Sequence, residues 1–93
     1  EFLGMIVEEL TEETARKLGI EFRRGIVIVE VKRGSPAEKS GLISGMIIQE
    51  VERKVTVNLG IFKEIVSEMD PEKGILILVS TINGSRYIFL QAN

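Results

Sequence analysis

The segment between residues 34 and 42 restricts most strongly how this chain can fold. It lies between two apolar runs and reads Gly34-Ser35-Pro36-Ala37-Glu38-Lys39-Ser40-Gly41-Leu42. Ser35 can cap a helix, a proline fits the first helical position, and a glutamate three residues after the cap completes a capping box. Gly41 can end the helix. The pattern predicts a helix of one or two turns between two strands.

The apolar runs on either side have the composition of strands. Residues 25–31 read Gly-Ile-Val-Ile-Val-Glu-Val, and β-branched side chains on both faces favour a central strand that is covered on both sides. Residues 46–51 form a second strand after Gly45, and residues 52–54 form a turn. Together these runs predict the middle of a sheet.

Capping residues predict two further helices. Thr11 is a good N-cap followed by two acids, and Gly19 fits the left-handed position that ends a helix. Asn58 is a good N-cap for a longer helix over residues 59–69, which carries a broad apolar stripe.

The two ends of the sequence supply the remaining strands. Residues 5–10 form a short strand, and residues 75–81 and 86–90 flank Asn83-Gly84, a strong hairpin signal. The predicted order is β-α-β-α-β-α-β-β over one domain, residues 1–93. This order favours an α+β fold with a small, strongly bent sheet or partly open barrel.

Composition excludes several classes of function. The net charge of −2 and the scattered basic residues give no nucleic-acid footprint, and no apolar run reaches the length of a membrane span. The chain has neither histidine nor cysteine, so a Ser-His-Asp triad and a zinc site are both excluded. We predict no catalytic residues, no metal and no cofactor. No signal-peptide pattern is visible in the sequence, which begins directly with Glu1-Phe2-Leu3-Gly4, and we interpret the chain as an excised fragment.

Two features are candidates for binding. Gly4, at the start of a strand, lets consecutive backbone N–H groups converge on a carboxylate, although a glycine there can equally be a plain turn. The stripe of the third helix is wider than one core-facing surface requires. Either all of it is core, or Leu59, Phe62 and Val66 face the core while Ile61 and Ile65 face a groove.

The order of these motifs resembles the PDZ domains of bacterial HtrA/Deg serine proteases. The resemblance rests on Gly-Ile-Val-Ile-Val-Glu-Val, on Gly-Ser-Pro-Ala followed by Gly-Leu, and on Gly-x-Ile-Ile. The opening, from Leu3-Gly4-Met5 to Leu18-Gly19, is most similar to the second, C-terminal PDZ domain of these proteases. Met46 and Arg53 depart from the aspartate and the glycine that are usual there, which weakens assignment to one subfamily.

The resemblance implies a circularly permuted PDZ barrel with two short helices and a longer groove helix. It implies that Phe2, Leu3, Gly4 and Met5 bind a peptide carboxylate, that the strand Met5–Glu9 pairs with the peptide, and that Met5 and Val7 line the pocket for its last side chain. The implied groove residues are Ile6, Val7, Asn58, Ile61, Phe62 and Ile65.

The implied function is a peptide-binding module for substrate recognition and regulation. It captures the C-terminus or an extended segment of unfolded polypeptides by β-strand addition, within a periplasmic serine endoprotease of protein quality control. On its own the domain is expected to be non-catalytic, and oligomerisation is expected to occur through the other domains of the parent protein. The alternative is a PDZ-like interaction domain of another bacterial protein: a site-two protease, a C-terminal-processing protease or a secretion-system scaffold.

Overall fold

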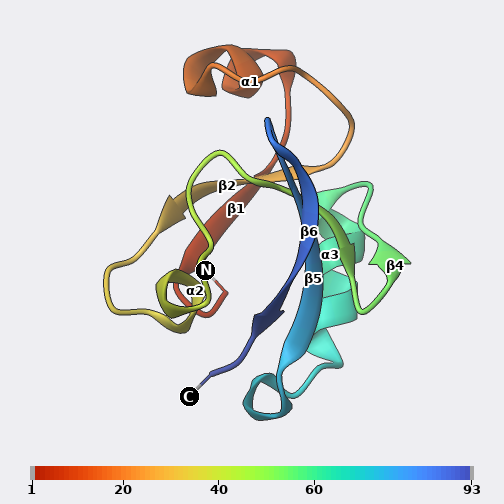
Figure 1. Cartoon of the computed structure of the whole chain (residues 1–93). Coiled ribbons are helices and arrows are strands. Elements are labelled where there is room, and N and C mark those ends of the chain that lie inside the picture. The colour runs from red at the N-terminus through yellow and green to blue at the C-terminus, as the bar shows by residue number, and fades with distance from the viewer. Residues whose placement is uncertain (1, 93) are drawn as a thin grey trace.

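The apolar runs of the sequence form one antiparallel sheet in the computed structural model, which describes residues 2–92 of the chain. The strands are β1 (Met5–Glu9), β2 (Ile26–Val31), β3 (Ile47–Val51), β4 (Lys54–Val55), β5 (Ile75–Thr81) and β6 (Gly84–Leu90). The helices are α1 (Glu12–Leu18), α2 (Pro36–Lys39), α3 (Leu59–Ser67) and a single 3-10 turn, η1 (Pro71–Lys73). The strand order is β1-β2-β3-β5-β6, and β4 pairs with β3 (Figure 1). The predicted α+β class and the small, partly open sheet are confirmed.

Two elements of this fold were not predicted. The two-residue strand β4 forms because the chain turns back at Glu52-Arg53 and pairs Val51 with Lys54. Such a strand is too short to leave a periodic pattern in the sequence. Helix α3 also ends at Ser67, before the expected Met69, and η1 follows it at Pro71.

Strand β2 lies between β1 and β3, as its apolar composition predicted. Its first half is buried on both faces, because Ile26 and Ile28 belong to the main core while Val27 packs in a smaller cluster. That smaller cluster also contains Ala15, so α1 covers the outer face of the sheet there. In Figure 1, α1 stands at one end of the molecule, apart from the other two helices.

The predicted helix caps are confirmed. The Thr11 hydroxyl accepts a hydrogen bond from the Thr14 N–H at 3.1 Å, and Gly19 ends α1 at a φ of 70°. The Asn58 side-chain oxygen accepts one from the Ile61 N–H at 2.9 Å. Because these signals act within a single turn of chain, local sequence specifies them.

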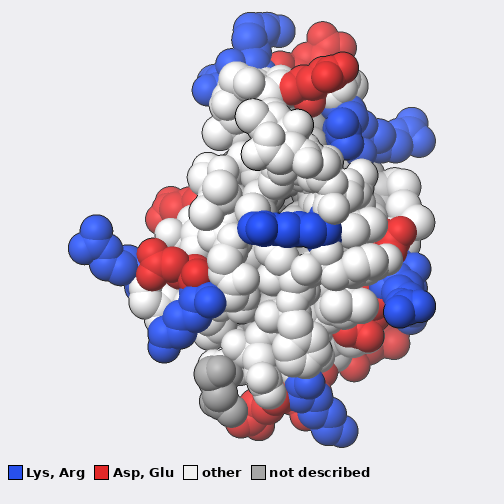
Figure 2. Space-filling model, viewed as in Figure 1, with Lys and Arg blue, Asp and Glu red and all other residues white. Residues whose placement is uncertain are grey.

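The surface bears charges of both signs. On the face shown in Figure 2, acidic and basic side chains lie mainly around the outline, and a basic side chain lies across the otherwise uncharged centre. Within residues 2–92 the one ion pair that forms joins Lys17 to Glu13 along α1, at 3.4 Å. No helix in this part of the chain is long and apolar enough to cross a membrane.

Candidate functional site: a groove between β1 and α3

The turn that precedes β1, called here the N-terminal turn, consists of Phe2, Leu3, Gly4 and Met5. The Phe2 N–H donates to the Met5 carbonyl at 2.8 Å, and the Met5 N–H donates to the Phe2 carbonyl at 3.0 Å. The two central residues have positive φ angles, 53° for Leu3 and 97° for Gly4. These angles identify a tight two-residue turn, of the kind that matches the twist of β-strands.

Helix α2 and the end of β2 hold this turn in place. The Leu3 carbonyl accepts a hydrogen bond from the Ala37 N–H at 3.1 Å, and the Gly4 carbonyl accepts one from the Lys32 N–H at 2.8 Å. A Cβ atom on Gly4 would overlap the Cβ and Oγ atoms of Ser35, so the turn lies directly against the N-cap of α2. Figure 1 shows α2 beside the N-terminal end of the chain.

The capping box of α2 takes a slightly different form from the one predicted. The Ser35 hydroxyl accepts from the Glu38 N–H at 3.2 Å, as expected. The Glu38 carboxylate, however, accepts from the Gly34 N–H at 2.7 Å rather than from the cap residue. The Ser35 N–H donates instead to the Lys32 carbonyl at 3.2 Å. Segment 32–38 is therefore internally bonded where it supports the N-terminal turn.

These contacts decide where the amides of the turn point. In a planar trans peptide unit the N–H points away from the preceding carbonyl. Since the Leu3 carbonyl faces α2, the Gly4 N–H faces away from it. The Phe2 carbonyl faces the Met5 N–H, so the Leu3 N–H, which belongs to the same peptide unit as that carbonyl, points away from Met5. Within residues 2–92 neither Leu3 nor Gly4 donates a backbone hydrogen bond, whereas the Met5 amide is already used by Phe2.

A groove opens between β1 and α3 beside this turn. Its walls come from the turn, from β1 and from one face of α3: Phe2, Val7, Leu59, Phe62, Lys63, Val66 and Ser67. Phe2 meets Phe62 edge to face, with ring centroids 5.9 Å apart, so aromatic side chains link the turn to the helix. β1 ends the strand order, so its second edge has no partner strand among the described residues. The groove therefore combines a free strand edge with apolar walls.

The face of α3 at the groove differs from the predicted one. Leu59, Phe62 and Val66 line the groove, whereas Ile61 and Ile65 are not among its walls. Successive helical residues are rotated by about 100°, so Ile61 and Ile65 lie well around the helix from Leu59 and Val66. Ile65 packs against the main core, as Leu59 and Val66 also do. We therefore propose Leu59 and Val66, rather than Ile61 and Ile65, as residues of α3 that line the groove.

The structure also places only some of the predicted groove residues of β1 in the groove wall. Met5 is fully buried in the main core, and it is absent from the groove walls. Val7 lines the groove as expected, while Ile6 does not. The pairing of β1 with β2 shifts register between Ile6 and Val7 because Val29 of β2 is the extra, unpaired residue, so β1 keeps its alternation and Met5 and Val7 stay on one face.

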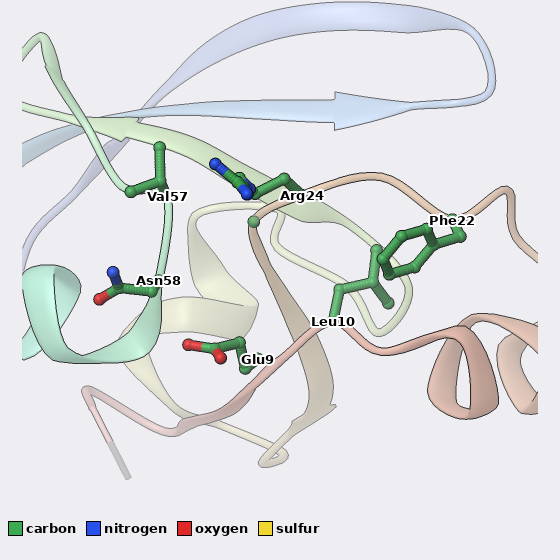
Figure 3. A pocket seen from close by; sticks show the side chains of 7 residues that line it. Glu9, Leu10, Phe22, Arg24, Val57 and Asn58 are labelled. Carbon is green, nitrogen blue, oxygen red and sulfur yellow. The ribbon is translucent and has the colours of Figure 1, made fainter.

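A hydrogen bond crosses from β1 to α3 at the far end of the groove. The Glu9 carboxylate accepts from the Leu59 N–H at 2.8 Å, and it thereby satisfies a free amide in the first turn of α3. Beyond it lies a second pocket, walled by Glu9, Leu10, Phe22, Arg24, Gly25, Val57 and Asn58 (Figure 3). Asn58, predicted at the groove, lies in this second pocket.

Sequence reasoning missed four groove residues, Leu59, Lys63, Val66 and Ser67. The available signal was the helical spacing of Leu59, Phe62 and Val66, which share one face of α3. That spacing is equally typical of a core-facing stripe. Phe62 serves both purposes, because it is buried in the core and also forms part of the groove wall.

Comparison with known proteins agrees with this architecture. The model of the family described as PDZ-like domain matches residues 1–71. A probable periplasmic serine endoprotease, DegP-like, of Chlamydia pneumoniae is 36% identical over 90 residues, which cover 96% of this chain and 18% of that protein. Its counterpart in Chlamydia muridarum is 30% identical over 92 residues, 98% of this chain and 18% of that protein. The chain thus spans about a fifth of the length of these relatives.

Solved structures share the fold. The HtrA-type protease AlgW with a decapeptide superposes with a TM-score of 0.85 and 28% identity, over 97% of this chain and 28% of that one. The HtrA3 PDZ domain bound to a phage-derived ligand, FGRWV, gives a TM-score of 0.79 and 24% identity, over 97% of this chain and 82% of that one. The predicted resemblance to HtrA/Deg PDZ domains is confirmed, and this chain belongs to the PDZ-like domain family.

Proposed function

We propose that this domain binds the C-terminal end of an extended polypeptide, which adds as a strand to β1. One observation carries the proposal. The free edge of β1 runs along an apolar groove and begins at a turn where the amides of Leu3 and Gly4 are unpaired and adjacent. Backbone amides bind a carboxylate without a charged side chain, and a strand edge supplies main-chain hydrogen bonds to the peptide.

The groove favours apolar peptide side chains. Phe2, Val7 and Val66 present carbon atoms to its interior, and an unpaired charge placed against such walls is heavily penalised. Lys63 is exposed at the margin and is the one ionisable side chain among the groove walls. The proposed ligand therefore has an apolar last residue, and its negative charge is confined to the terminal carboxylate.

The relatives support a place for this domain in a longer protein. Proteins that resemble it over nearly its whole length are named periplasmic serine endoproteases, and one solved relative carries a decapeptide. On this basis the domain recognises substrates or activating peptides for an HtrA/Deg-type protease of the periplasm. The domain itself is non-catalytic, because a chain without histidine or cysteine lacks the usual general base and thiol nucleophile.

The test compares two peptides that differ only at their C-terminus. A hexapeptide ending in Ser-Val-Ser-Val is prepared with a free carboxylate and as the amide, and both are titrated into the domain by calorimetry. We expect a micromolar Kd for the acid, about −6 to −8 kcal/mol. Amidation should weaken binding by about 1.5–3 kcal/mol, the scale of hydrogen bonds to a charged group. Equal affinities would show that the domain does not recognise the terminal carboxylate of the peptide.

A matched pair of variants tests which face of α3 binds. Val66→Lys places a long cation in the groove, whereas Ile61→Lys places the same side chain on the other flank of the helix. Both residues are partly exposed, so a lysine head group can reach water from either position. We expect at least a tenfold loss of peptide affinity for Val66→Lys and little change for Ile61→Lys. The reverse result would restore the original assignment of Ile61 to the groove.

A further inference from the structure

The second pocket is a cavity at the end of the groove, and the proposed function gives it no role. It lies where β1 ends, and its walls also include the segment between α1 and β2 and the residues just before α3. Its volume is about 520 Å³, so it has ample room for one large side chain. Phe22 is 49% exposed and Val57 37% exposed, so apolar surface here still faces solvent.

The second pocket lies in line with the groove. Val7 lines the groove and Glu9 lines the second pocket, and these residues are two apart on β1. The side chain of Glu9 reaches Leu59 at the start of α3, so both side chains face the helix side of the strand. Residues two apart in a strand share a face. Any strand added along β1 therefore carries alternate side chains from the groove into the second pocket.

The position along such a peptide follows from the strand direction. A peptide whose carboxylate meets Leu3 and Gly4 runs antiparallel to β1. Its last residue lies near Met5, its third from last opposite Val7, and its fifth from last opposite Glu9. Directly opposed residues of paired strands point to the same face. The fifth residue from the C-terminus therefore directs its side chain into the second pocket.

The walls of the second pocket select the chemistry of that side chain. Figure 3 shows Phe22 and Leu10 at one side, Val57 and Asn58 at the other, and the charged groups of Arg24 and Glu9 above and below the space between them. Arg24 makes no ion pair within residues 2–92, whereas the Glu9 carboxylate is held by the Leu59 N–H.

Opposite charges on facing walls disfavour a charged occupant. An acidic side chain is attracted by Arg24 but repelled by Glu9. A basic side chain is attracted by Glu9 but repelled by Arg24. An aromatic ring avoids both penalties, because it can pack on Phe22 while its face attracts the Arg24 guanidinium. A small aliphatic side chain would leave most of the cavity unfilled.

We infer that the second pocket is a specificity site for an aromatic side chain at the fifth residue from the C-terminus of the bound peptide. The inference rests on the proposed function, since it requires strand addition to β1 with the carboxylate at the N-terminal turn. It extends that function from the last few residues of the ligand to an upstream residue, and it gives the segment between α1 and β2 a binding role.

The experiment varies one residue of an unlabelled hexapeptide, Gly-Xaa-Ser-Val-Ser-Val with a free carboxylate and an acetylated amino end. Xaa is Trp, Phe, Ala, Asp or Lys, and each peptide competes against the same fluorescent ligand for the domain. We expect the Trp and Phe peptides to bind about fivefold to tenfold more tightly than the Ala peptide, the size of one aromatic contact with partial burial. The Asp and Lys peptides should not exceed the Ala peptide.

Two variants locate the effect in the second pocket. Phe22→Ala should reduce the preference for Trp over Ala to less than about twofold, because the ring loses its packing partner. Phe22 is absent from both core clusters, so the fold should persist, and circular dichroism checks this. Ile82→Ala is the control: Ile82 is 92% exposed at the β5–β6 hairpin, away from the walls of this pocket, and it should keep the full preference.

The other outcomes separate this inference from the proposed function. If the peptides bind in a carboxylate-dependent way but all five have equal affinity, the second pocket does not select the side chain at this position. The inference is then overturned, while the proposed function stands. If the Asp peptide binds most tightly, or if the Trp preference survives in Phe22→Ala, the aromatic site is overturned in the same way. If no acid peptide binds, strand addition fails, and both proposals fail with it.

Discussion

The chain contains two tight turns of nearly the same backbone shape, and we propose a binding role for only one of them. In the N-terminal turn the central residues Leu3 and Gly4 have φ angles of 53° and 97°. In the β3–β4 turn, Val51–Lys54, the central residues Glu52 and Arg53 have φ angles of 52° and 66°. Both pairs adopt the left-handed conformation that favours glycine.

The difference lies in the amides. In the β3–β4 turn the Glu52 N–H donates to the Leu76 carbonyl at 2.8 Å, and the Glu52 carboxylate accepts from the Leu76 N–H at 2.7 Å. That turn is bonded to β5. In the N-terminal turn the carbonyls are the groups that are bonded, which leaves the N–H groups of Leu3 and Gly4 unpaired within residues 2–92. The two turns therefore share a shape but differ in which backbone groups are already hydrogen-bonded, and this difference is the reason that we propose an anion site at the N-terminal turn alone.

The largest expected effect is that of Gly4→Ala. The new methyl group overlaps Ser35, and alanine disfavours a φ of 97°, so we expect the free energy of unfolding to fall by about 2–4 kcal/mol. The preference for a free over an amidated peptide should disappear, because the turn must move. Urea denaturation and peptide titration measure the two effects. Unchanged stability would show that α2 does not fix this turn.

A second substitution should restore part of that loss. Ser35→Gly removes the Cβ and Oγ atoms that the new methyl group meets, so the double variant Gly4→Ala/Ser35→Gly has room for it. We expect a favourable coupling of about 1–2 kcal/mol in a double-mutant cycle, on the scale measured for residues in contact. Strict additivity would mean that the cost of Gly4→Ala arises from backbone strain alone.

Ser35→Ala should have a smaller effect and a different one. It deletes the hydroxyl that accepts from the Glu38 N–H but keeps the Cβ that faces Gly4. We expect a loss of about 0.5–2 kcal/mol, as for other N-caps, with less than a twofold change in peptide affinity. Thermal denaturation and titration decide this. A large loss of affinity at unchanged stability would mean that the hydroxyl itself contacts the ligand.

The smallest effect is expected in the β3–β4 turn and has the opposite sign. Arg53→Gly relieves a left-handed arginine whose side chain is exposed, at the cost of greater freedom in the unfolded chain. We expect a net gain of about 0.5 kcal/mol. Glu52→Gly is the control: it also removes strain but loses the carboxylate that holds Leu76, so it should destabilise. Denaturant midpoints compare the two, and equal shifts would contradict this account.

Much of the fold could be predicted because it depends on short-range signals. The caps at Thr11, Ser35 and Asn58 and the β-branched run of β2 each act through neighbouring residues, and the structure contains all of them. The left-handed conformations of Leu3 and Arg53 could not be predicted in this way. Neither residue type favours that conformation, and the surrounding structure imposes it.

The site was harder to predict than the fold. The apolar stripe of α3 includes residues on both flanks, and the sequence contains nothing that says which flank meets β1. Docking of the helix packs Leu59, Ile65 and Val66 against the core, and of these it leaves Leu59 and Val66 in the groove wall. Likewise, Met5 is fully buried in the main core, and the alternation of β1 does not distinguish such a position from one in the groove wall. Such features are decided by long-range packing.

The contacts between α2 and the N-terminal turn also limit how this domain can be re-engineered. Residues 2–5 alone are not a portable module, because their amides are oriented by Ala37 and Lys32 and their glycine fits against Ser35. A protein engineer who grafts the turn onto another scaffold must transfer residues 32–37 with it, in the same spatial relation. The smallest transplantable unit is therefore discontinuous: two pieces of chain separated by most of β1 and by all of α1 and β2.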